Sequence, residues 1–541
     1  MKRNNMCPFC YIRNLLVGAK KVAAVPEIEK YETGVRRTPL MGWSSWNTFR
    51  NRIDEDLILE TAEAMKEKGL LDAGYSYVNL DDCWQSNVRD ENGDLQGDLA
   101  TFPSGIKPLV EKINAMGFKL GLYSSNGTLT CEDLPASLGR ERQDAQTLAE
   151  WGVEYFKYDF CHNVPLSSYA PLIWAVTVTE KGEKQGQRYL CSNAVLEGLA
   201  RFMPDKGLEG KRYVSGLDAG KGKMVFKNVF AKKSGDYVLT LNIKKHGRYP
   251  KFVIAEVNGT PYEINFPDQK HFQHTARFQT VVRLEEGNNE IKLYNPVASG
   301  KDSAILQYRK MAYALKAATK TVAEKQNAPE KPILFSICEW GFRKPWLWGD
   351  TAGNMWRTTP DIRPIWPWIK LIYARNVKLF ERSSAGHFND PDMLEVGNGK
   401  LSYDQNTSHF ALWCFMNAPL VLGNDVRKMP DNVLEIITNK SLININQDEL
   451  CKQAKRVKKG RVDVLAKPLA GGRTAVLFFN KSGVKKKISF NLETLKKDAY
   501  VSAKFDAENP SVTPVFGGVE ANGKVVSATL EKCASAAFIV E

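Results

Sequence analysis

Apolar residues recur along this chain with two different spacings. Short runs rich in apolar and aromatic residues, such as 77–80 and 155–158, are separated by stretches in which apolar residues such as Ile58, Ala62 and Met65 return every three or four positions before a glycine. The runs are typical of buried strands, and the spaced residues are typical of amphipathic helices. This alternation of strand and helix predicts parallel strands joined by crossover helices.

Eight such strands are predicted, and their spacing is regular except at one point. They fall within 38–47, 77–82, 118–123, 155–159, 333–339, 356–361, 387–393 and 418–422. The strand ends at 82, 123 and 159 are 41 and 36 residues apart, but the next end, at 339, comes 180 residues after 159. We therefore predict an α/β fold, a (β/α)8 TIM barrel, whose fourth strand is followed by about 140 extra residues.

The extra residues and the end of the chain have a different pattern, with short strands separated by turn residues. Turns such as 234–236 and 286–288 are typical of antiparallel β-sandwiches. The predicted division is a disordered leader at 1–32, the barrel at 33–185 and 305–454, an inserted β-sandwich at 186–304 and a C-terminal β-sandwich at 455–541. We expect the C-terminal sandwich to be a structural cap on the barrel.

The composition excludes several classes of protein. The net charge is +14, from 75 Lys and Arg against 61 Asp and Glu, but the lysines are scattered and no basic motif occurs, so we expect a solvated basic surface and no nucleic-acid partner. Cys7 and Cys10 form a C-x-x-C without a second pair, and the chain has only 6 His, so neither indicates a metal site. No apolar run reaches about 18 residues, so no transmembrane helix is expected, and no intact signal peptide is visible.

Polar residues stand at the ends of several predicted strands, where a barrel carries its chemistry. They are Trp46, Asp81, Asp82, Tyr123, Lys157, Asp159, Glu339, Arg357, Asp361 and Asp392. Many carboxylates together with aromatic rings suit a sugar, and two acids in different environments can act as nucleophile and acid/base. Lys157 next to Asp159 would keep that carboxylate ionised, whereas an acid/base needs the reverse, a raised pKa. A divalent metal site is the alternative, which we rank lower because aromatic residues and Lys157 share this end.

Six motifs, in this order along the chain, resemble those of one enzyme family. They are Met41-Gly42-Trp43-x-x-Trp46, Asp81-Asp82-Cys83-Trp84, Lys157-Tyr158-Asp159, Cys338-Glu339-Trp340, Trp356-Arg357-x-x-x-Asp361 and Asn389-Asp390-Pro391-Asp392-Met393-Leu394. The chain resembles glycoside hydrolase family 27, the α-galactosidases (melibiases) and α-N-acetylgalactosaminidases, over roughly 33–165 and 305–455 and in its C-terminal sandwich. One motif alone would be a weak signal, whereas six in the family's order are a strong one.

The resemblance implies a retaining double displacement, with Asp159 as the nucleophile, Asp361 as the acid/base and no cofactor. In retaining enzymes the two carboxyl groups are about 5–5.5 Å apart. The residues that match substrate-binding positions are Trp46, Asp81, Asp82, Tyr123, Lys157, Cys338, Glu339, Trp340, Arg357 and Asp392. Among them Glu339 matches the position that reads the 2-position and favours a free 2-hydroxyl. Asp82, where a Glu is associated with pentose preference, leaves room for the hydroxymethyl group of galactose.

The resemblance also implies a disulfide between Cys131 and Cys161, which indicates an oxidising compartment. The usual partner of Cys83 is absent, since Asn51-Arg52-Ile53 stands there, so Cys83 is expected to be a free thiol. The insert resembles carbohydrate-binding modules of families 6 and 35 through 225–229, 235–237 and 286–289. Whether it binds sugar or calcium, or only shapes access to the barrel, stays open.

Together these features predict an exo-acting α-galactosidase whose partner is a carbohydrate substrate. The alternatives are an α-N-acetylgalactosaminidase, a β-L-arabinopyranosidase, or a carbohydrate-binding protein without catalytic activity; the presence of both Asp159 and Asp361 opposes the last. We expect an extracytoplasmic location, periplasmic or secreted, with a cytoplasmic one as the alternative. The oligomeric state, the natural substrate and the start of the mature chain are left open.

Overall fold

The computed structural model describes residues 21–244, 250–266, 275–506 and 510–541. The chain forms two compact units. One unit comprises Pro165–Leu306 together with the described residues up to Ile28, and the other comprises Glu29–Val164 and Gln307–Glu541. Each unit is described below by itself.

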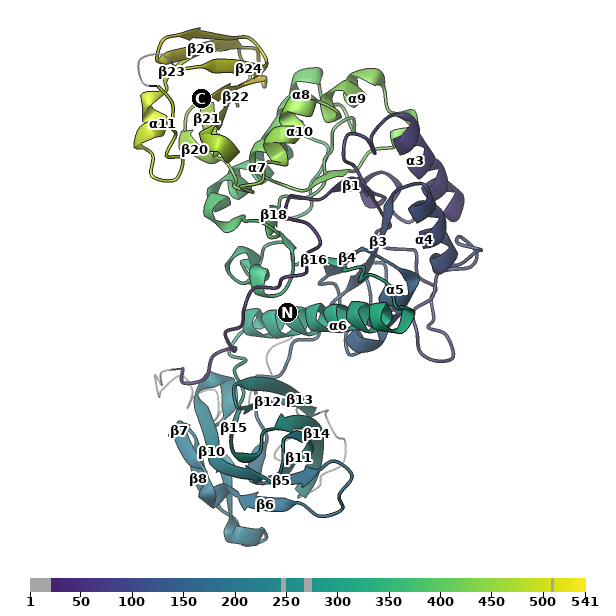
Figure 1. The fold of residues 1–541 in the computed structure, drawn as a ribbon, viewed down its shortest axis with the longest axis vertical. Helices are drawn as coiled ribbons and strands as arrows, with labels where there is room; N and C mark the ends of the chain where they lie inside the picture. Colours follow the sequence, from purple (N-terminus) through teal and green to yellow (C-terminus); the bar gives the residue numbers. More distant parts are fainter. Residues whose placement is uncertain (1–20, 245–249, 267–274, 507–509) are drawn as a thin grey trace. The chain divides into compact units, whose positions relative to one another are not determined.

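The larger unit contains the predicted barrel (Figure 1). Its eight parallel strands lie in the order β18-β17-β16-β4-β3-β2-β1-β19. Their bounds are β1 Met41–Ser44, β2 Tyr77–Asn79, β3 Lys119–Ser125, β4 Tyr155–Asp159, β16 Leu334–Ile337, β17 Met355–Arg357, β18 Phe388–Asp390 and β19 Leu420–Leu422. Leu394, just after β18, pairs in parallel with Leu422 of β19 and so joins the two ends of the sheet. The TIM barrel predicted from the sequence is therefore confirmed.

Helices follow the strands as the glycine-terminated patterns predict. They are α2 Trp46–Phe49, α3 Glu55–Glu67, α4 Ile106–Ala115, α5 Glu141–Trp151, α6 Gly300–Gln326, α7 Trp366–Asn376, α8 Tyr403–Phe415, α9 Asp431–Ile437 and α10 Lys440–Asn446. The Asp54 carboxylate caps α3 by accepting the N–H of Leu57, and α5 ends at Gly152 with a left-handed φ of 80°. These local signals fix the start of α3 and the end of α5.

Large buried side chains from most of the barrel strands pack together in one cluster. One cluster comprises Leu40, Tyr77, Tyr155, Leu334, Met355, Phe388, Met393, Val421 and Cys451. The strands β2 and β3 lie so close together that a Cβ on Gly121 would be 2.1 Å from Oδ1 of Asn79. Only glycine fits there, and the close packing holds the strand ends in fixed positions.

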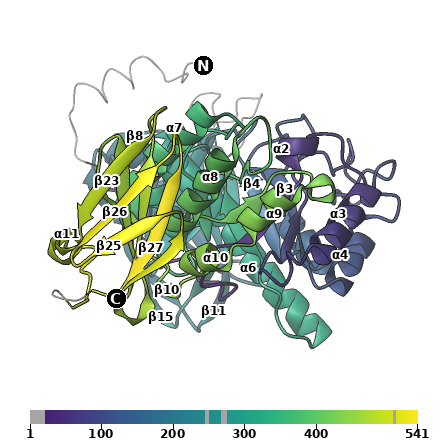
Figure 2. The same cartoon turned by 90° about the horizontal axis from the view of Figure 1, so that it is seen from above.

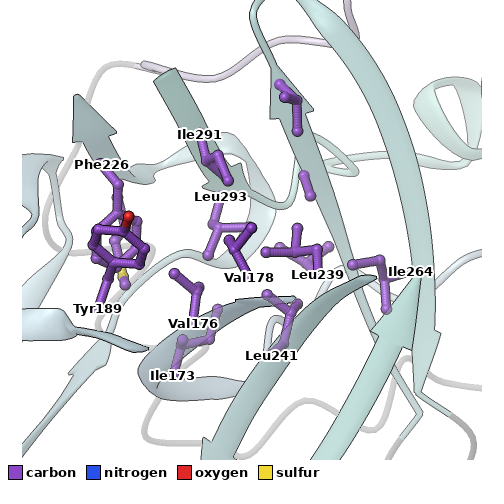
Figure 3. Close-up of a cluster of buried hydrophobic side chains, with 14 of the residues drawn as sticks. Ile173, Val176, Val178, Tyr189, Phe226, Leu239, Leu241, Ile264, Ile291 and Leu293 are labelled. Atoms are coloured by element: carbon purple, nitrogen blue, oxygen red, sulfur yellow. The ribbon is translucent and has the colours of Figure 1, made fainter. Parts of the chain in front are cut away.

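The smaller unit is the predicted insert, built from two antiparallel sheets. One sheet has the order β13-β12-β15-β10-β7, and the other has the order β14-β11-β5-β9-β8 with β6 paired to β5. The bounds are β5 Leu172–Glu180, β6 Gln187–Leu190, β7 Val195–Gly198, β8 Arg201–Pro204, β9 Arg212–Ser215, β10 Gly222–Ala231, β11 Gly235–Lys244, β12 Lys251–Val257, β13 Thr260–Phe266, β14 Thr275–Leu284 and β15 Gly287–Tyr294. Figure 3 shows apolar side chains of both sheets, among them Val176, Leu239 and Leu293, meeting in one core.

The boundary of the insert differs from the predicted 186–304. The strand β5 pairs with β11 over most of its length, and the compact unit begins at Pro165. Ile173, Val176 and Val178 of this strand are buried in the core of the insert. The sequence prediction assigned 172–180 to the barrel because an apolar run does not reveal which sheet it joins.

The C-terminal residues form two further antiparallel sheets, β20-β21-β22-β27-β24 and β23-β26-β25. The bounds are β20 Lys455–Lys458, β21 Val462–Pro468, β22 Thr474–Asn480, β23 Lys486–Asn491, α11 Glu493–Lys497, β24 Val512–Phe516, β25 Val519–Asn522, β26 Val525–Leu530 and β27 Ser535–Val540. Figure 2 shows these yellow strands beside α8, where Ser408 donates a hydrogen bond of 2.8 Å to the carbonyl of Cys533. The sandwich therefore packs on the barrel helices.

The predicted leader at 1–32 is described only from residue 21 onwards, so Cys7 and Cys10 lie outside the described residues. Within this part Tyr31 is buried, and its hydroxyl donates to the carbonyl of Ala312. The end of the predicted leader is thus part of the folded unit. Across the described residues, no helix has the length and apolar character needed to cross a membrane.

Candidate active site

The carboxyl end of the barrel carries most of the polar residues singled out in the sequence. Asp159 is the last residue of β4 and Arg357 is the last residue of β17. Asp81, Cys338 and Asp392 follow their strands β2, β16 and β18 within two residues. Parallel strands deliver all these side chains to one end of the barrel because their carboxyl ends meet there.

Lys157 lies between two carboxylates. Its Nζ is 2.8 Å from Oδ2 of Asp81 and 3.9 Å from Oδ2 of Asp159, and it stands 5.1 Å from the ring centroid of Tyr123. Burial by itself would lower the pKa of Lys157, but the charges of Asp81, Cys338 and Asp159 outweigh it and raise the pKa. The ammonium group is therefore charged at any physiological pH.

Asp159 is a buried carboxylate with one oxygen held by the backbone. The N–H of Phe160 donates to Oδ1 at 2.8 Å. Burial raises the pKa of Asp159 to about 6, Lys157 and the Phe160 N–H oppose this rise, and the charge of Asp361 adds to it. The group is ionised at neutral pH, and its electrostatic coupling to Asp361 indicates that the two acids share one site.

Arg357 is the second buried cation of the site. Its Nη2 is 2.7 Å from Oδ2 of Asp392 and 2.9 Å from Oδ1 of Asp361, and its Nη1 is 3.7 Å from Sγ of Cys338. Asp392 in turn accepts the backbone N–H groups of Ile362 and Met393 at 2.8 Å each. The guanidinium therefore links the segments that follow β16, β17 and β18.

Asp361 differs from Asp159 in both exposure and acidity. Its side chain is 71% exposed. Crowding by the surrounding protein would raise the pKa of Asp361, but the charges of Arg357 and Lys157 outweigh it and lower the pKa. This is the reverse of the raised pKa that the sequence argument requires of an acid/base, because the sequence does not show that Arg357 contacts this carboxylate.

Asp82 is held by the loop that the disulfide anchors. Its oxygens accept the N–H of Cys83 at 2.8 Å and the N–H of Glu132 at 3.0 Å, and burial raises the pKa of Asp82 to about 6. The predicted disulfide between Cys131 and Cys161 is present, and Cys83 is a free thiol as expected. The Tyr123 hydroxyl donates to Sγ of Cys131 at 3.3 Å, so the disulfide also supports an aromatic residue of the site.

Glu339 does not occupy the place that the resemblance implies. Its side chain is 0% exposed, and its two oxygens accept the N–H of Arg343 at 2.9 and 2.8 Å and Nη1 of Arg343 at 3.2 Å. The carboxylate presents no free face to a sugar, which disagrees with its predicted reading of the 2-position. Neighbouring residues at a strand exit point to opposite sides, so Cys338 faces Arg357 while Glu339 faces Arg343.

The divalent metal alternative is not supported by this arrangement. Within the described residues, the only group of potential ligands that lie close together is Cys131, Asp159 and Cys161. The two sulfurs are bonded to each other, and the Lys157 ammonium stands 3.9 Å from Asp159. A cation beside the carboxylate repels a divalent metal.

Several further residues support the site without having been singled out in the sequence. Ser45 Oγ accepts the N–H of Asp81 at 3.0 Å, and Asp390 accepts the N–H of Asp392 at 2.8 Å. Glu395 accepts Nδ2 of Asn47 at 2.8 Å, next to Trp46. Asp390 belongs to a motif that the sequence showed, but nothing in the sequence separates Ser45 and Glu395 from ordinary loop residues.

Comparisons with known proteins show which family this chain is similar to. A family profile described as "Alpha galactosidase A" matches residues 38–182 and 285–448. A second profile, "Alpha galactosidase C-terminal beta sandwich domain", matches residues 459–539. The two profiles cover the barrel and the C-terminal sandwich and leave out most of the insert.

Individual relatives can be aligned with most of the chain. Alpha-galactosidase 2 of Arabidopsis thaliana is 32% identical over 458 residues, which are 84% of this chain and 78% of the relative. Alpha-galactosidase A of Cellvibrio japonicus is 31% identical over 479 residues, 86% of this chain and 81% of the relative. Among solved structures, α-galactosidase I of Mortierella vinacea has a TM-score of 0.63 at 24% identity, covering 94% of this chain and 98% of that one. A GH27 β-L-arabinopyranosidase of Geobacillus stearothermophilus has a TM-score of 0.58 at 15% identity, covering 93% and 96%; both structural likenesses concern the fold.

Proposed function

This chain belongs to the alpha-galactosidase A family of glycoside hydrolases, family 27, and on that premise we propose that it is an exo-acting α-galactosidase that releases terminal α-D-galactosyl residues. The observation that carries the proposal is the pair Asp159 and Asp361, coupled electrostatically and flanked by Lys157 and Arg357 at the carboxyl end of the barrel. A buried carboxylate beside a more exposed one suits a nucleophile and an acid/base.

In the first step Asp159 attacks the anomeric carbon of the galactosyl residue. Its carboxylate forms a C–O bond while the bond to the leaving oxygen breaks, and Asp361 gives that oxygen its proton. The Phe160 N–H fixes Oδ1 of Asp159 at 2.8 Å, which favours attack through Oδ2. The product of this step is a covalent galactosyl ester and the free leaving group.

In the second step water replaces Asp159. Asp361, now a carboxylate, takes a proton from the water as its oxygen attacks the anomeric carbon, and Asp159 leaves as a carboxylate. Two inversions give a product with the original configuration. The Arg357 guanidinium, 2.9 Å from Asp361, stabilises the carboxylate form that this step requires.

The galactose hydroxyls would be held by the charged residues around the pair. We assign Asp81, Asp82 and Lys157 to the 4- and 6-hydroxyl side, with Trp46 and Tyr123 as aromatic contacts and Asp392 fixed by Arg357. Asp82, at the position where a Glu is associated with pentose preference, supports galactose over a pentose. At the 2-position we assign Trp340 in place of Glu339, because Trp340 is partly exposed whereas the Glu339 side chain is fully buried.

The test is hydrolysis of three chromogenic glycosides: the α-galactoside, the α-N-acetylgalactosaminide and the β-L-arabinopyranoside. We expect a clear preference in kcat/KM for the α-galactoside, with NMR showing release of α-galactose before mutarotation. Preference for either other glycoside would reassign the specificity. No release from any of the three by folded protein would leave a carbohydrate-binding role as the better account.

We further propose an oxidising, extracytoplasmic place of action. The support is the disulfide between Cys131 and Cys161, which anchors the loop holding Asp82. Measuring free thiols in protein recovered from its native source, before and after reduction, checks this. Recovery of the protein with both thiols reduced would contradict it.

A further inference from the structure

Glu395 lies at the seam where the barrel closes. The end of β18 meets β19 through the parallel pair of Leu394 and Leu422, and Glu395 follows this pair directly. The residue is buried, with only 1% of its surface exposed. Its backbone N–H donates to Nε2 of His409 on α8 at 2.9 Å, and burial lowers the pKa of His409 to about 3, so this nitrogen stays a neutral acceptor. The backbone of Glu395 is therefore fixed to the helix behind it.

The carboxylate of Glu395 joins three loops at the carboxyl end of the barrel. Oε1 accepts Nδ2 of Asn47 at 2.8 Å, and Oε2 accepts Nδ2 of Asn398 at 2.6 Å. The same nitrogen of Asn398 also donates to the carbonyl of Gly423 at 3.1 Å, which in turn accepts Oγ1 of Thr48 at 2.6 Å. The segments that follow β1, β18 and β19 are thus held together around one carboxylate.

The residue held by Oε1 stands next to Trp46 in the helix α2. This helix has only four residues, and one turn of helix is not stable by itself, so contacts with other parts of the chain decide where it lies. The Trp46 ring is partly exposed, and Cζ of Arg50 lies 6.0 Å from its centroid. The contact between Glu395 and Asn47 therefore fixes the short element that carries this ring.

Burying a carboxylate in this place has an electrostatic cost. Burial raises the pKa of Glu395 to about 7, and the charge of Asp392 adds to this rise, whereas the amides of Asn398 and Asn47 and the charge of Arg50 oppose it. The two amide donors thus stabilise the ionised form that accepts both of their hydrogen bonds. The contribution of Asp392 places this carboxylate within electrostatic reach of the site.

We propose that Glu395 is a positioning residue for substrate binding, which holds Asn47 and thereby keeps the Trp46 ring against the galactosyl residue. The inference rests on the proposed function, in which Trp46 is an aromatic contact of the sugar. An aromatic ring packs on the sugar in the ground state and in the transition state alike, so its displacement weakens both to the same extent. KM should therefore respond to a change at Glu395, and kcat should change little.

The test reverses the hydrogen bond. With the chromogenic α-galactoside, Asn47→Asp should raise KM about tenfold, because two carboxylates then face each other, and kcat should stay within about twofold. Adding Glu395→Gln should bring KM back to within about threefold of its original value. The new amide can donate to the new carboxylate while its oxygen still accepts Asn398. Asn47→Ala, which removes the donor without adding a charge, tests the same contact if Asn47→Asp fails to fold.

Two further measurements separate positioning from general stability. In a Trp46→Ala background, Asn47→Ala should raise KM no further, since the two changes act through the same ring. Glu55→Gln is the matched control, because Glu55 is also a buried carboxylate and accepts hydrogen bonds from Ser104 and Lys112. It should lower the midpoint of thermal unfolding and leave KM unchanged.

Several outcomes would overturn the inference. An unchanged KM in the folded Asn47 variants would show that this contact does not support binding. A full rise in KM when Trp46 is absent would show that Asn47 acts elsewhere, and an equal rise in Glu55→Gln would indicate general loosening of the barrel. Each of these results leaves the proposed function in place. Failure of the unaltered, folded protein to hydrolyse the α-galactoside would instead refute that function, and this role with it.

Discussion

Nη2 of Arg357 lies 2.9 Å from Oδ1 of Asp361, so the proposed acid/base is paired with a buried cation. This contact lowers the pKa of Asp361, whereas burial raises the pKa of Asp159 to about 6. The carboxyl group that must donate a proton is thus the stronger acid of the two. The two carboxyl groups share a single proton, which resides mainly on Asp159. Catalysis requires the less populated arrangement, in which this proton is on Asp361.

The first prediction concerns the pH dependence of kcat/KM, which reports the free enzyme. The pair carries one proton only between its two pKa values, so activity should be highest below pH 6 and fall above about 6 as that proton is lost. With α-galactosyl fluoride, whose leaving group needs no proton, this alkaline decline should disappear. A profile that instead rises through pH 6 with an ordinary galactoside would contradict the assignment.

The second prediction follows from the Arg357–Asp361 contact. Removing the cation in Arg357→Gln should raise the pKa of Asp361 by about one unit or more, and should move the alkaline decline of kcat/KM to higher pH. The overall rate should also fall, because Asp392 loses its partner. Arg427→Gln, which breaks the ion pairs with Glu60 and Asp425, is the control and should leave the profile in place.

The third prediction tests the nucleophile. Asp159→Asn should reduce turnover of the chromogenic α-galactoside by at least about a thousandfold, because the amide cannot form the covalent intermediate. Galactose binding, measured by calorimetry, should persist. Asp56→Asn, the same substitution at an exposed position on α3, is the matched control. Near-normal turnover in Asp159→Asn would remove this residue from the nucleophile role.

The fourth prediction separates direct from indirect roles of Glu339. Since its carboxylate is occupied by Arg343, Glu339→Gln should lower the free energy of unfolding by about 1–3 kcal/mol. The ratio of kcat/KM between the α-galactoside and its 2-deoxy analogue should stay the same. If that ratio collapsed, Glu339 would contact the 2-hydroxyl after all.

The fifth prediction concerns the disulfide. Replacing Cys131 and Cys161 by Ser should cost about 2–4 kcal/mol of stability, since the bond closes a loop of 30 residues. KM should rise as well, because Asp82 relies on the N–H of Glu132 in this loop. Cys83→Ser, which changes a free thiol and keeps the backbone donor to Asp82, should alter neither quantity.

Local patterns in the sequence were sufficient to predict the barrel, and the family motifs were sufficient to propose its reacting residues. A glycine such as Gly152 ends a helix whatever lies around it, and a carboxylate such as Asp159 at a strand end reaches the same end of any parallel barrel. These properties depend on the backbone and on residue spacing. The sequence by itself therefore determined the fold class, and its resemblance to the family indicated the two proposed acids and the disulfide.

Only the tertiary structure decided which way side chains point and which partners they meet. Glu339 turns to Arg343 and Cys338 turns to Arg357, and β5 joins the sheet of the insert. The acidity of Asp361 likewise depends on Arg357. Electrostatic energies and sheet membership depend on distances between residues far apart in the chain, and these distances exist only once the chain has folded.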